Sequence, residues 1–257
     1  MQKQRGFTLI ELLVVIAIIA LLMSILMPAL SKAKSAAQDV IDKSNQHQFT
    51  LIFKFYTDEH DGYFPPRGSG TTPTAQLAMA AWPYLIADYM PNIDENMWFC
   101  PSATKPYIEG GRPPFAAWNT PLDEPPVIYG SYGVNFWVSS YNPATAGASR
   151  DPDKFWQTPN IRGCAYAPLL IDCTWKDTEP EPYDPAPEYD GDMDIGGPEI
   201  KRVCINRHNY KVNASFLDMS VKTTGLKRLW KLKWHKKWSL DAFPAGGWPA
   251  WMEHLPE

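Results

Sequence analysis

The feature that most constrains this chain is an uncharged apolar run near its N-terminus, which extends from Leu12 to Leu30. A helix rises about 1.5 Å per residue, so this run is about as long as the hydrocarbon core of a bilayer is thick. Ser24 and Pro28 are its only interruptions, and both are tolerated towards the end of a membrane helix. Nothing else in the chain could cover so long an apolar helix, and we therefore predict a transmembrane helix over residues 7–30.

A single carboxylate, Glu11, stands at the entrance to this run. A carboxylate in a membrane segment costs about 2.5–3.5 kcal/mol, so such a residue normally has a function and a partner. The residues before it form a short leader, 1–6, which carries Lys3 and Arg5. Because cations stay on the cytoplasmic side, we expect the leader inside the cell and the rest of the chain outside.

The order of basic leader, Gly6, Phe7 and then Glu11 resembles the processing signal of type IV pilins and type II secretion pseudopilins. The likeness is dense from Gly6 to about Ala37. It implies that a prepilin peptidase cleaves after Gly6 and methylates the new amine of Phe7. It further implies that the Phe7 ammonium pairs with Glu11 of a neighbouring subunit in a filament.

Two plainer interpretations compete for the same segment. An ordinary secretory signal peptide needs a cleavage site of small residues, and Ala-Leu-Ser at 29–31 is a poor one. A glutamate opening the apolar region is also wrong for that class. The remaining interpretation is a plain single-pass membrane anchor.

The helical pattern continues beyond the apolar run, and residues 31–61 are predicted to form the amphipathic half of the same helix. Asp61-Gly62 is expected to end it, because glycine supplies the left-handed cap. The predicted apolar stripe, which should face a domain, comprises Ala33, Ala36, Ala37, Val40, Ile41, Leu51, Ile52, Phe55 and Tyr56.

Residues 62–257 are predicted to form one extracytoplasmic head domain. The resemblance implies a pilin-like α+β fold, in which the long helix packs on an antiparallel sheet. Thr178–Gly197 is rich in proline and acidic residues and predicts an exposed loop. The other expected elements are a short helix over 75–89, strands over 128–141 and 169–173, two strands within 201–223, and a basic helix over 226–238.

Composition limits the possible partners and the compartment. The net charge is −4, and loss of Lys3 and Arg5 with the leader makes it more negative, so we expect no nucleic-acid partner. Cysteines outside the cytoplasm meet an oxidising space, which predicts at least one disulfide. Three pairings are possible and the sequence does not choose among them, although we expect Cys164 or Cys173 to take part. The cysteines are Cys100, Cys164, Cys173 and Cys204.

His208 and Asp218 are separated by nine residues. They resemble the C-terminal signature of a pseudopilin-like family abundant in planctomycete-type bacteria, in which an Arg-His-Asn turn precedes a strand ending in Asp-Gly-His. Here Met219 and Ser220 replace the glycine and the histidine. We predict a structural role, in which a hydrogen bond from His208 to Asp218 closes a hairpin. No motif supplies a positioned nucleophile, so we do not expect an enzyme.

Alternating carboxylates at Asp190, Asp192 and Asp194 could converge on calcium. The spacing fails the EF-hand pattern, since Lys201 stands where a bidentate glutamate is needed. A solvated acidic loop is the favoured interpretation, and no other cofactor is expected.

Tryptophans and cations alternate in the segment 226–238. Trp230, Trp234 and Trp238 are four residues apart, with Lys227 and Lys231 in an adjacent row. Such a surface could bind nucleic acid or anionic lipid. The favoured interpretation is a helix whose indoles pack on the sheet while its lysines stay in water.

These observations predict a structural, pilin-like subunit of a type II secretion or type IV pilus-like filament. It would be a single-pass protein of the inner membrane with a periplasmic or extracellular head. Its partners would be the prepilin peptidase, other pilin-like subunits and the membrane. The main rival is a membrane-tethered module that recognises glycan or DNA through the Trp- and Lys-rich surface.

Overall fold

The computed structural model describes residues 9–66, 82–90, 94–119, 128–141, 150–192 and 196–257. The chain divides into two compact units, residues 1–38 and residues 39–257.

The first unit is helical. Helix α1, Leu9–Glu59, is 51 residues long, and its first part belongs to this unit. The helix is long and apolar enough to cross a membrane. It continues through Pro28, and the Ser24 hydroxyl donates a hydrogen bond to the Leu21 carbonyl one turn earlier. The predicted continuous helix is therefore confirmed.

The second part of α1 belongs to the head unit and buries one face there. Glycine ends it as predicted: Gly62 has φ +82° and its amide donates to the Thr57 carbonyl at 2.8 Å. The predicted apolar stripe is only partly correct, because Ile52 and Tyr56 are buried while Phe55 is exposed. The buried residues are Asp42, Asn45, Gln46, Phe49, Thr50, Ile52, Phe53, Tyr56 and Thr57.

The main sheet of the head has five strands in the order β6-β4-β5-β7-β8. β4 pairs antiparallel with β5, β5 with β7, and β7 with β8, whereas β4 and β6 pair parallel. The sheet is therefore mixed, although an antiparallel sheet was expected. The strands are β4 (Tyr132–Asn135), β5 (Pro168–Asp172), β6 (Asp177–Thr178), β7 (Lys211–Phe216) and β8 (Val221–Gly225).

A smaller sheet of three strands has the order β1-β2-β3. Its strands are β1 (Lys105–Pro106), β2 (Ala116–Asn119) and β3 (Tyr129–Gly130). β1 and β2 pair parallel, and β2 and β3 pair antiparallel. The predicted strand over 128–141 is thus divided between two sheets and ends in a 3₁₀ turn.

The other helices of the head are short. The described part of the predicted helix over 75–89 consists of α3 (Trp82–Leu85) and a 3₁₀ turn. The last helix is α4 (Ala250–Glu253). The 3₁₀ turns are η1 (Ala87–Tyr89), η2 (Glu95–Trp98), η3 (Tyr107–Glu109), η4 (Phe136–Val138), η5 (Pro152–Lys154), η6 (Cys164–Tyr166), η7 (Glu199–Arg202) and η8 (Leu226–Lys231).

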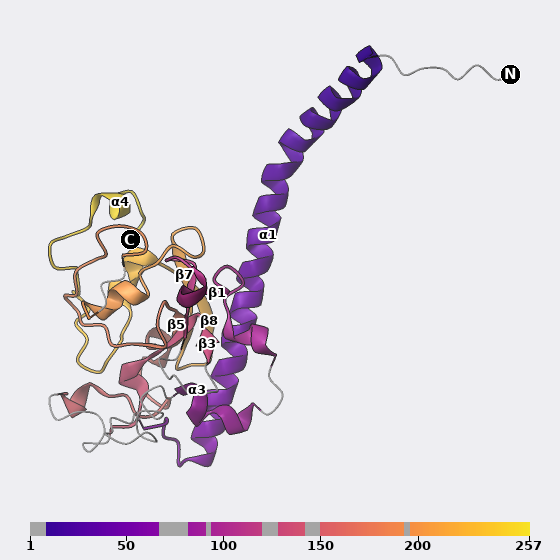
Figure 1. Cartoon of the computed structure of the whole chain (residues 1–257). Helices are drawn as coiled ribbons and strands as arrows, with labels where there is room; N and C mark the ends of the chain where they lie inside the picture. Colours follow the sequence, from indigo (N-terminus) through magenta and orange to yellow (C-terminus); the bar gives the residue numbers. More distant parts are fainter. Residues whose placement is uncertain (1–8, 67–81, 91–93, 120–127, 142–149, 193–195) are drawn as a thin grey trace. The chain divides into compact units, whose positions relative to one another are not determined.

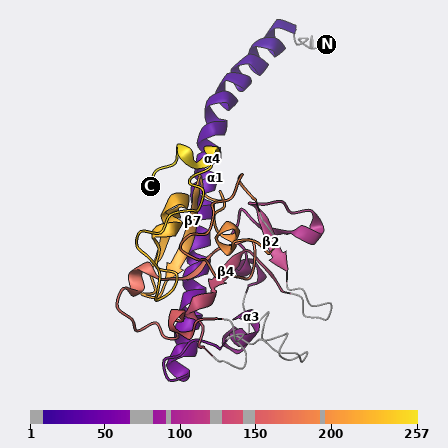
Figure 2. The same ribbon diagram turned by 90° about the vertical axis from the view of Figure 1, so that its left-hand side faces the viewer.

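The core of the head lies between the sheet, the second part of α1 and the connecting segments. All five residues of β5 are buried, which fits a central strand covered on both faces. Phe49 of α1 packs edge-on against Trp82 at 5.4 Å between ring centroids and against Tyr132 of β4 at 6.1 Å. The two views agree that residues 39–59 of α1 run alongside the strands (Figure 1 and Figure 2).

Candidate functional site

The predicted processing and assembly segment lies at the start of α1. Gly6 and Phe7 lie outside the described residues, so their roles remain predictions. Glu11 is in the first turn of the helix. The large apolar side chains after it are exposed within the chain, for example Leu12 at 53%, Ile18 at 52% and Leu26 at 65%. A side chain this apolar needs lipid or another protein around it.

The head part of α1 also carries exposed apolar side chains. They are Val40, Ile41, Leu51 and Phe55, which are 40–66% exposed. At about 100° of rotation per residue these four fall within a sector about 100° wide. The residues that α1 buries against the head lie on the opposite side of the helix. We call these four residues the outer stripe of α1.

A buried polar cluster joins α1 to the sheet of the head. It contains Asp42 of α1, Cys100 after η2, Asp172 at the end of β5 and His208 in the turn before β7. One ligand atom from each residue lies within 4.8 Å of the other three. Asp42, Cys100 and Asp172 are fully buried and His208 is 9% exposed.

His208 Nε2 is the centre of this cluster. It lies 3.2 Å from Asp172 Oδ2, 3.4 Å from Asp42 Oδ2 and 3.4 Å from Cys100 Sγ. Its other ring nitrogen, Nδ1, lies 3.6 Å from Oδ1 of Asp39. The imidazole is therefore placed between three carboxylates and a thiol.

Local backbone geometry explains why His208 points inward. Asn209 and Tyr210 both have positive φ, +54° and +60°, and the His208 amide donates to the Lys211 carbonyl at 3.0 Å. Asparagine is tolerated in this left-handed region, whereas tyrosine is uncommon there. The tight turn that results holds the imidazole over the end of β5.

Arg207, beside it, is fully buried and fixes the surrounding backbone. Its guanidinium donates to the carbonyls of Pro114, Ala116, Ser131 and Cys173. Nη1 also lies 3.5 Å from Oδ1 of Asp172, an oxygen that has no hydrogen-bond partner among the described residues. This arginine supplies part of the positive charge that the buried carboxylates require.

The pKa values follow from burial and from the close charges. Burial alone lowers the pKa of His208, but its hydrogen bonds to Asp172 and Asp42 outweigh burial and raise it to about 12. Burial raises the pKa of the Cys100 thiol to about 12, and the two carboxylates act in the same direction. Burial, and then the charge of Asp42, raise the pKa of Asp172. Without another cation the cluster holds an imidazolium and a neutral thiol.

The predicted hydrogen bond between His208 and Asp218 is wrong. The two residues lie at opposite ends of β7, and Asp218 instead accepts from the amide and hydroxyl of Ser220. Strand β7 carries Asp218 away from the turn that holds His208, at about 3.3 Å per residue. The carboxylates that meet His208 come from α1 and β5, and no local sequence motif links them to it.

The predicted disulfide is also absent, since all four cysteines are free. Cys100 faces His208, and Cys204 packs 4.0 Å from the sulfur of Met252. Cys173 lies against β4, where a Cβ on Gly133 would come within 2.7 Å of its side chain. Cys164, in η6, is only partly buried. The fold thus gives each thiol different neighbours.

The acidic loop is only partly described, because Asp194 lies outside the described residues. Asp192 is 8% exposed and its Oδ2 lies 2.8 Å from Lys201 Nζ, so its charge already has a partner. Asp190 accepts a hydrogen bond from the Asn206 amide at 3.1 Å. The loop is less solvated than predicted, and calcium binding by it stays a prediction.

The Trp- and Lys-rich segment is part of the core. Only residues 226–231 are helical, as the 3₁₀ turn η8, so the predicted helix to Trp238 is wrong. The indoles are buried as predicted: Trp230 and Trp234 are 0% exposed and Trp238 is 5% exposed. Lys227 is buried as well and donates to the Glu253 carbonyl, so the expectation that the lysines stay in water fails for it.

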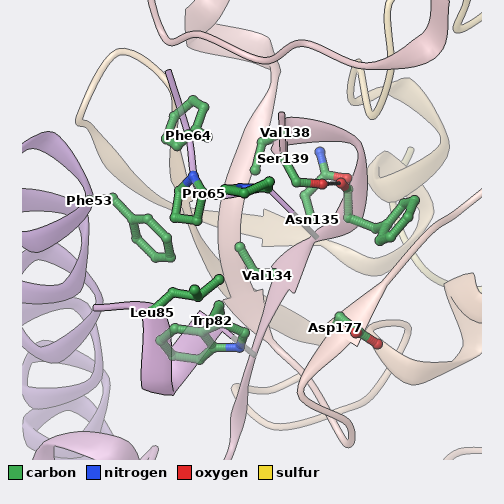
Figure 3. A pocket seen from close by; sticks show the side chains of 12 residues that line it. Phe53, Phe64, Pro65, Trp82, Leu85, Val134, Asn135, Val138, Ser139 and Asp177 are labelled. Carbon is green, nitrogen blue, oxygen red and sulfur yellow. Dashed lines mark hydrogen bonds between the residues drawn. The ribbon is translucent and has the colours of Figure 1, made fainter. Parts of the chain in front are cut away.

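Two of the cavities in the described part of the head bear on its function. One, of about 40 Å³, is an apolar gap next to Phe53, Phe64 and Val134, too small for a ligand (Figure 3). The other is a cleft of about 730 Å³, which we call the aromatic cleft. It is lined by Tyr107, Arg112, Pro113, Asn119, Trp175, Tyr189, Asp190, Gly191, Lys201 and Arg202.

Comparison with known proteins identifies the N-terminal segment. A family model described as the prokaryotic N-terminal methylation motif matches residues 1–27. The chain is also 38% identical over 63 residues to the type IV wide pilus major component PilA4 of Thermus thermophilus. That alignment covers 24% of this chain and 48% of the relative, so the chain spans about half the length of the curated relative. No solved structure matches the chain.

The N-terminal segment of the chain is therefore similar to that of type IV pilin-like proteins, as its resemblance to pilins and pseudopilins indicated. The long apolar helix followed by a mixed sheet is an α+β, pilin-like architecture.

Proposed function

We propose that this protein is a structural subunit of a type IV pilus-like or type II secretion filament. The observation that carries the proposal is the methylation motif over residues 1–27, with Glu11 five positions after Gly6. The first part of α1 would anchor the subunit in the inner membrane as a single pass. The head would then lie in the periplasm or outside the cell. A filament subunit needs no catalytic residues, and the proposal assigns none.

The structure of α1 supports assembly through helix packing. One face of residues 39–59 is buried in the head, while the outer stripe leaves Val40, Leu51 and Phe55 exposed. The apolar residues after Glu11 are exposed in the same way. Helices of neighbouring subunits would bury both surfaces when the subunits leave the membrane for a filament.

A prepilin peptidase would cleave between Gly6 and Phe7. The Phe7 ammonium would then pair with the Glu11 carboxylate of the next subunit, which gives this charge a partner in apolar surroundings. The relative from Thermus thermophilus is a pilus component, but it is matched over only 48% of its length. Both a pilus and a secretion filament therefore stay within the proposal.

The test is expression with a prepilin peptidase, followed by mass spectrometry of the mature N-terminus. We expect a mature chain that begins with a methylated Phe7. Gly6→Val should leave full-length precursor, because the peptidase must approach a backbone without a side chain. Gly225→Val is a matched control that also alters a glycine but leaves the cleavage site unchanged, since Gly225 has φ −66° and room for a side chain. Normal maturation of Gly6→Val would contradict the assignment, as would cleavage after residue 31.

A second candidate function is a membrane-tethered module that binds glycan. The indoles of the Trp- and Lys-rich segment, which were expected to bind it, are buried. The aromatic cleft instead offers Tyr107, Trp175 and Tyr189 for stacking on sugar rings. Two of the three cations that line it, Lys201 and Arg202, are already paired with carboxylates. Binding of a neutral oligosaccharide that Trp175→Ala abolishes, in a chain that forms no filaments, would favour this function.

A further inference from the structure

In the buried cluster of Asp42, Cys100, Asp172 and His208, the other three ligand atoms lie about as far from His208 Nε2 as they would in a metal site. In a tetrahedral zinc site the metal lies about 2.0–2.2 Å from nitrogen and oxygen and about 2.3 Å from sulfur. At the tetrahedral angle those lengths place neighbouring ligand atoms about 3.3–3.7 Å apart. The distances from His208 Nε2 to Asp172 Oδ2, Asp42 Oδ2 and Cys100 Sγ are 3.2, 3.4 and 3.4 Å.

The hydrogen-bonding capacity of His208 does not account for this arrangement. One ring nitrogen carries at most one proton, yet Nε2 faces two carboxylate oxygens and a sulfur at similar distances. The two carboxylates also lie within 4.8 Å of each other while fully buried, where like charges repel strongly. A cation at the centre would satisfy all four donors at once.

The surroundings of the four residues fit metal ligands. Nδ1 of His208 faces Oδ1 of Asp39 at 3.6 Å, the carboxylate–histidine pairing that orients many metal-bound imidazoles. Asn213 holds both carboxylates: its amide donates to Asp172 Oδ2 at 2.8 Å and its side chain to Asp42 Oδ2 at 2.7 Å. Tyr132 donates to the other oxygen of Asp42 at 2.7 Å.

Two fully buried oxygens near the cluster have no hydrogen-bond partner among the described residues. They are Oδ1 of Asp172 and Oε1 of Gln46. Gln46 lies one turn after Asp42, and its amide group lies 3.4 Å from Asp42 Oδ2. Oδ1 of Asp172 faces Arg207 Nη1 at 3.5 Å without a hydrogen bond, so the buried carboxylate keeps charge that a further cation would balance.

We propose that Asp42, Cys100, Asp172 and His208 bind one divalent cation of the zinc type as a closed structural site. The donors are one nitrogen, one sulfur and two oxygens, a set that suits zinc. Two carboxylates and a thiolate carry three negative charges, and the dication together with Arg207 balances them. The site goes beyond the filament role and does not depend on it.

The cation would connect parts of the head that are far apart in the sequence. Its ligands come from α1, the segment after η2, the end of β5 and the turn before β7. All four cysteines are free, so no disulfide makes this connection. Metal binding is coupled to folding in such sites, and removal of the metal should loosen α1 from the sheet.

The experiment uses the full chain in detergent micelles. It is freed of metal with a chelator and then titrated with Zn²⁺ or with Co²⁺ as a spectroscopic probe. We expect one bound ion per chain, a higher thermal midpoint with Zn²⁺, and a near-ultraviolet thiolate-to-cobalt absorption band. Cys100→Ser should abolish that band, and Cys164→Ser is the matched control that keeps it.

A second variant separates binding from folding. Asp39→Asn removes the carboxylate that orients His208 but none of the ligands, and we expect it to weaken Zn²⁺ binding by about 10–100-fold. His47→Gln, an exposed histidine on the same helix, should leave the affinity unchanged. If the folded wild-type chain binds no stoichiometric Zn²⁺ or Co²⁺, or if its cobalt spectrum lacks the thiolate band, the cluster is a clamp of imidazolium and carboxylates and the proposal is wrong.

Discussion

Replacing Arg207 by methionine should be among the most destabilising single changes in the head. Methionine keeps most of the length and apolar volume but removes every donor. Up to four buried carbonyls lose a partner, and each unsatisfied group costs about 1–3 kcal/mol. The change also removes a charge next to the buried Asp172, and breaking one side of a buried ion pair costs about 3–5 kcal/mol.

These two costs overlap, because the same guanidinium makes all the contacts. We therefore expect Arg207→Met to lower the free energy of unfolding by about 4 kcal/mol or more, a large part of the ~5–15 kcal/mol of an ordinary domain. Arg207→Lys keeps the charge but has a single nitrogen, so it should lose about half as much.

The assay is urea unfolding of the full chain in detergent, followed by tryptophan fluorescence, since the head holds eleven tryptophans. With a slope of about 1–3 kcal/mol per M of urea, the midpoint should fall by more than about 1 M. Arg112→Met, at an exposed arginine, is the control and should not shift it. A shift below about 0.3 M for Arg207→Met would show that the buried arginine contributes little and would refute the reasoning.

Three further predictions follow from the same structure. Glu11→Leu should insert and mature normally but give almost no sheared filaments, because a buried Phe7 ammonium without its carboxylate partner costs about 3–5 kcal/mol. Glu11→Asp keeps the charge and should assemble weakly. Wild-type filament yield from Glu11→Leu would contradict this role. Phe55→Glu should leave the thermal midpoint unchanged yet reduce filament yield at least tenfold, since Phe55 is 58% exposed, and unchanged yield would exclude the outer stripe from assembly. Burial raises the pKa of Glu199 from 4.5 to about 7 despite Arg202, so its protonated form is favoured in the folded state. Stability should consequently fall as pH rises from about 4.5 to about 7, and Glu199→Gln should flatten that slope in urea midpoints measured across the range.

The N-terminal helix of the molecule could be predicted from its sequence because its determinants are local. The apolar run after Glu11 fixes a helix by its length, and Gly62 ends that helix through its own backbone freedom. The methylation motif is likewise contiguous, and the comparison with residues 1–27 confirms it. Hydrophobic periodicity correctly predicted that the second part of α1 is an amphipathic helix. It did not predict which face of the helix is buried, since Phe55 fits the apolar pattern and yet is exposed.

The buried cluster was decided by tertiary structure alone. Asp42 and His208 are 166 positions apart, and no sequence motif contains both residues. Sequence analysis identified His208 but predicted Asp218 as its partner. Spacing along the chain can suggest a partner ten positions away, but it cannot indicate a carboxylate on a distant helix or strand. Cys100 was counted only as one of four cysteines that could form a disulfide, for the same reason. Only the packing of α1 against the ends of β5 and β7 brings Asp42, Cys100, Asp172 and His208 together, because long-range contacts are set by how whole elements dock.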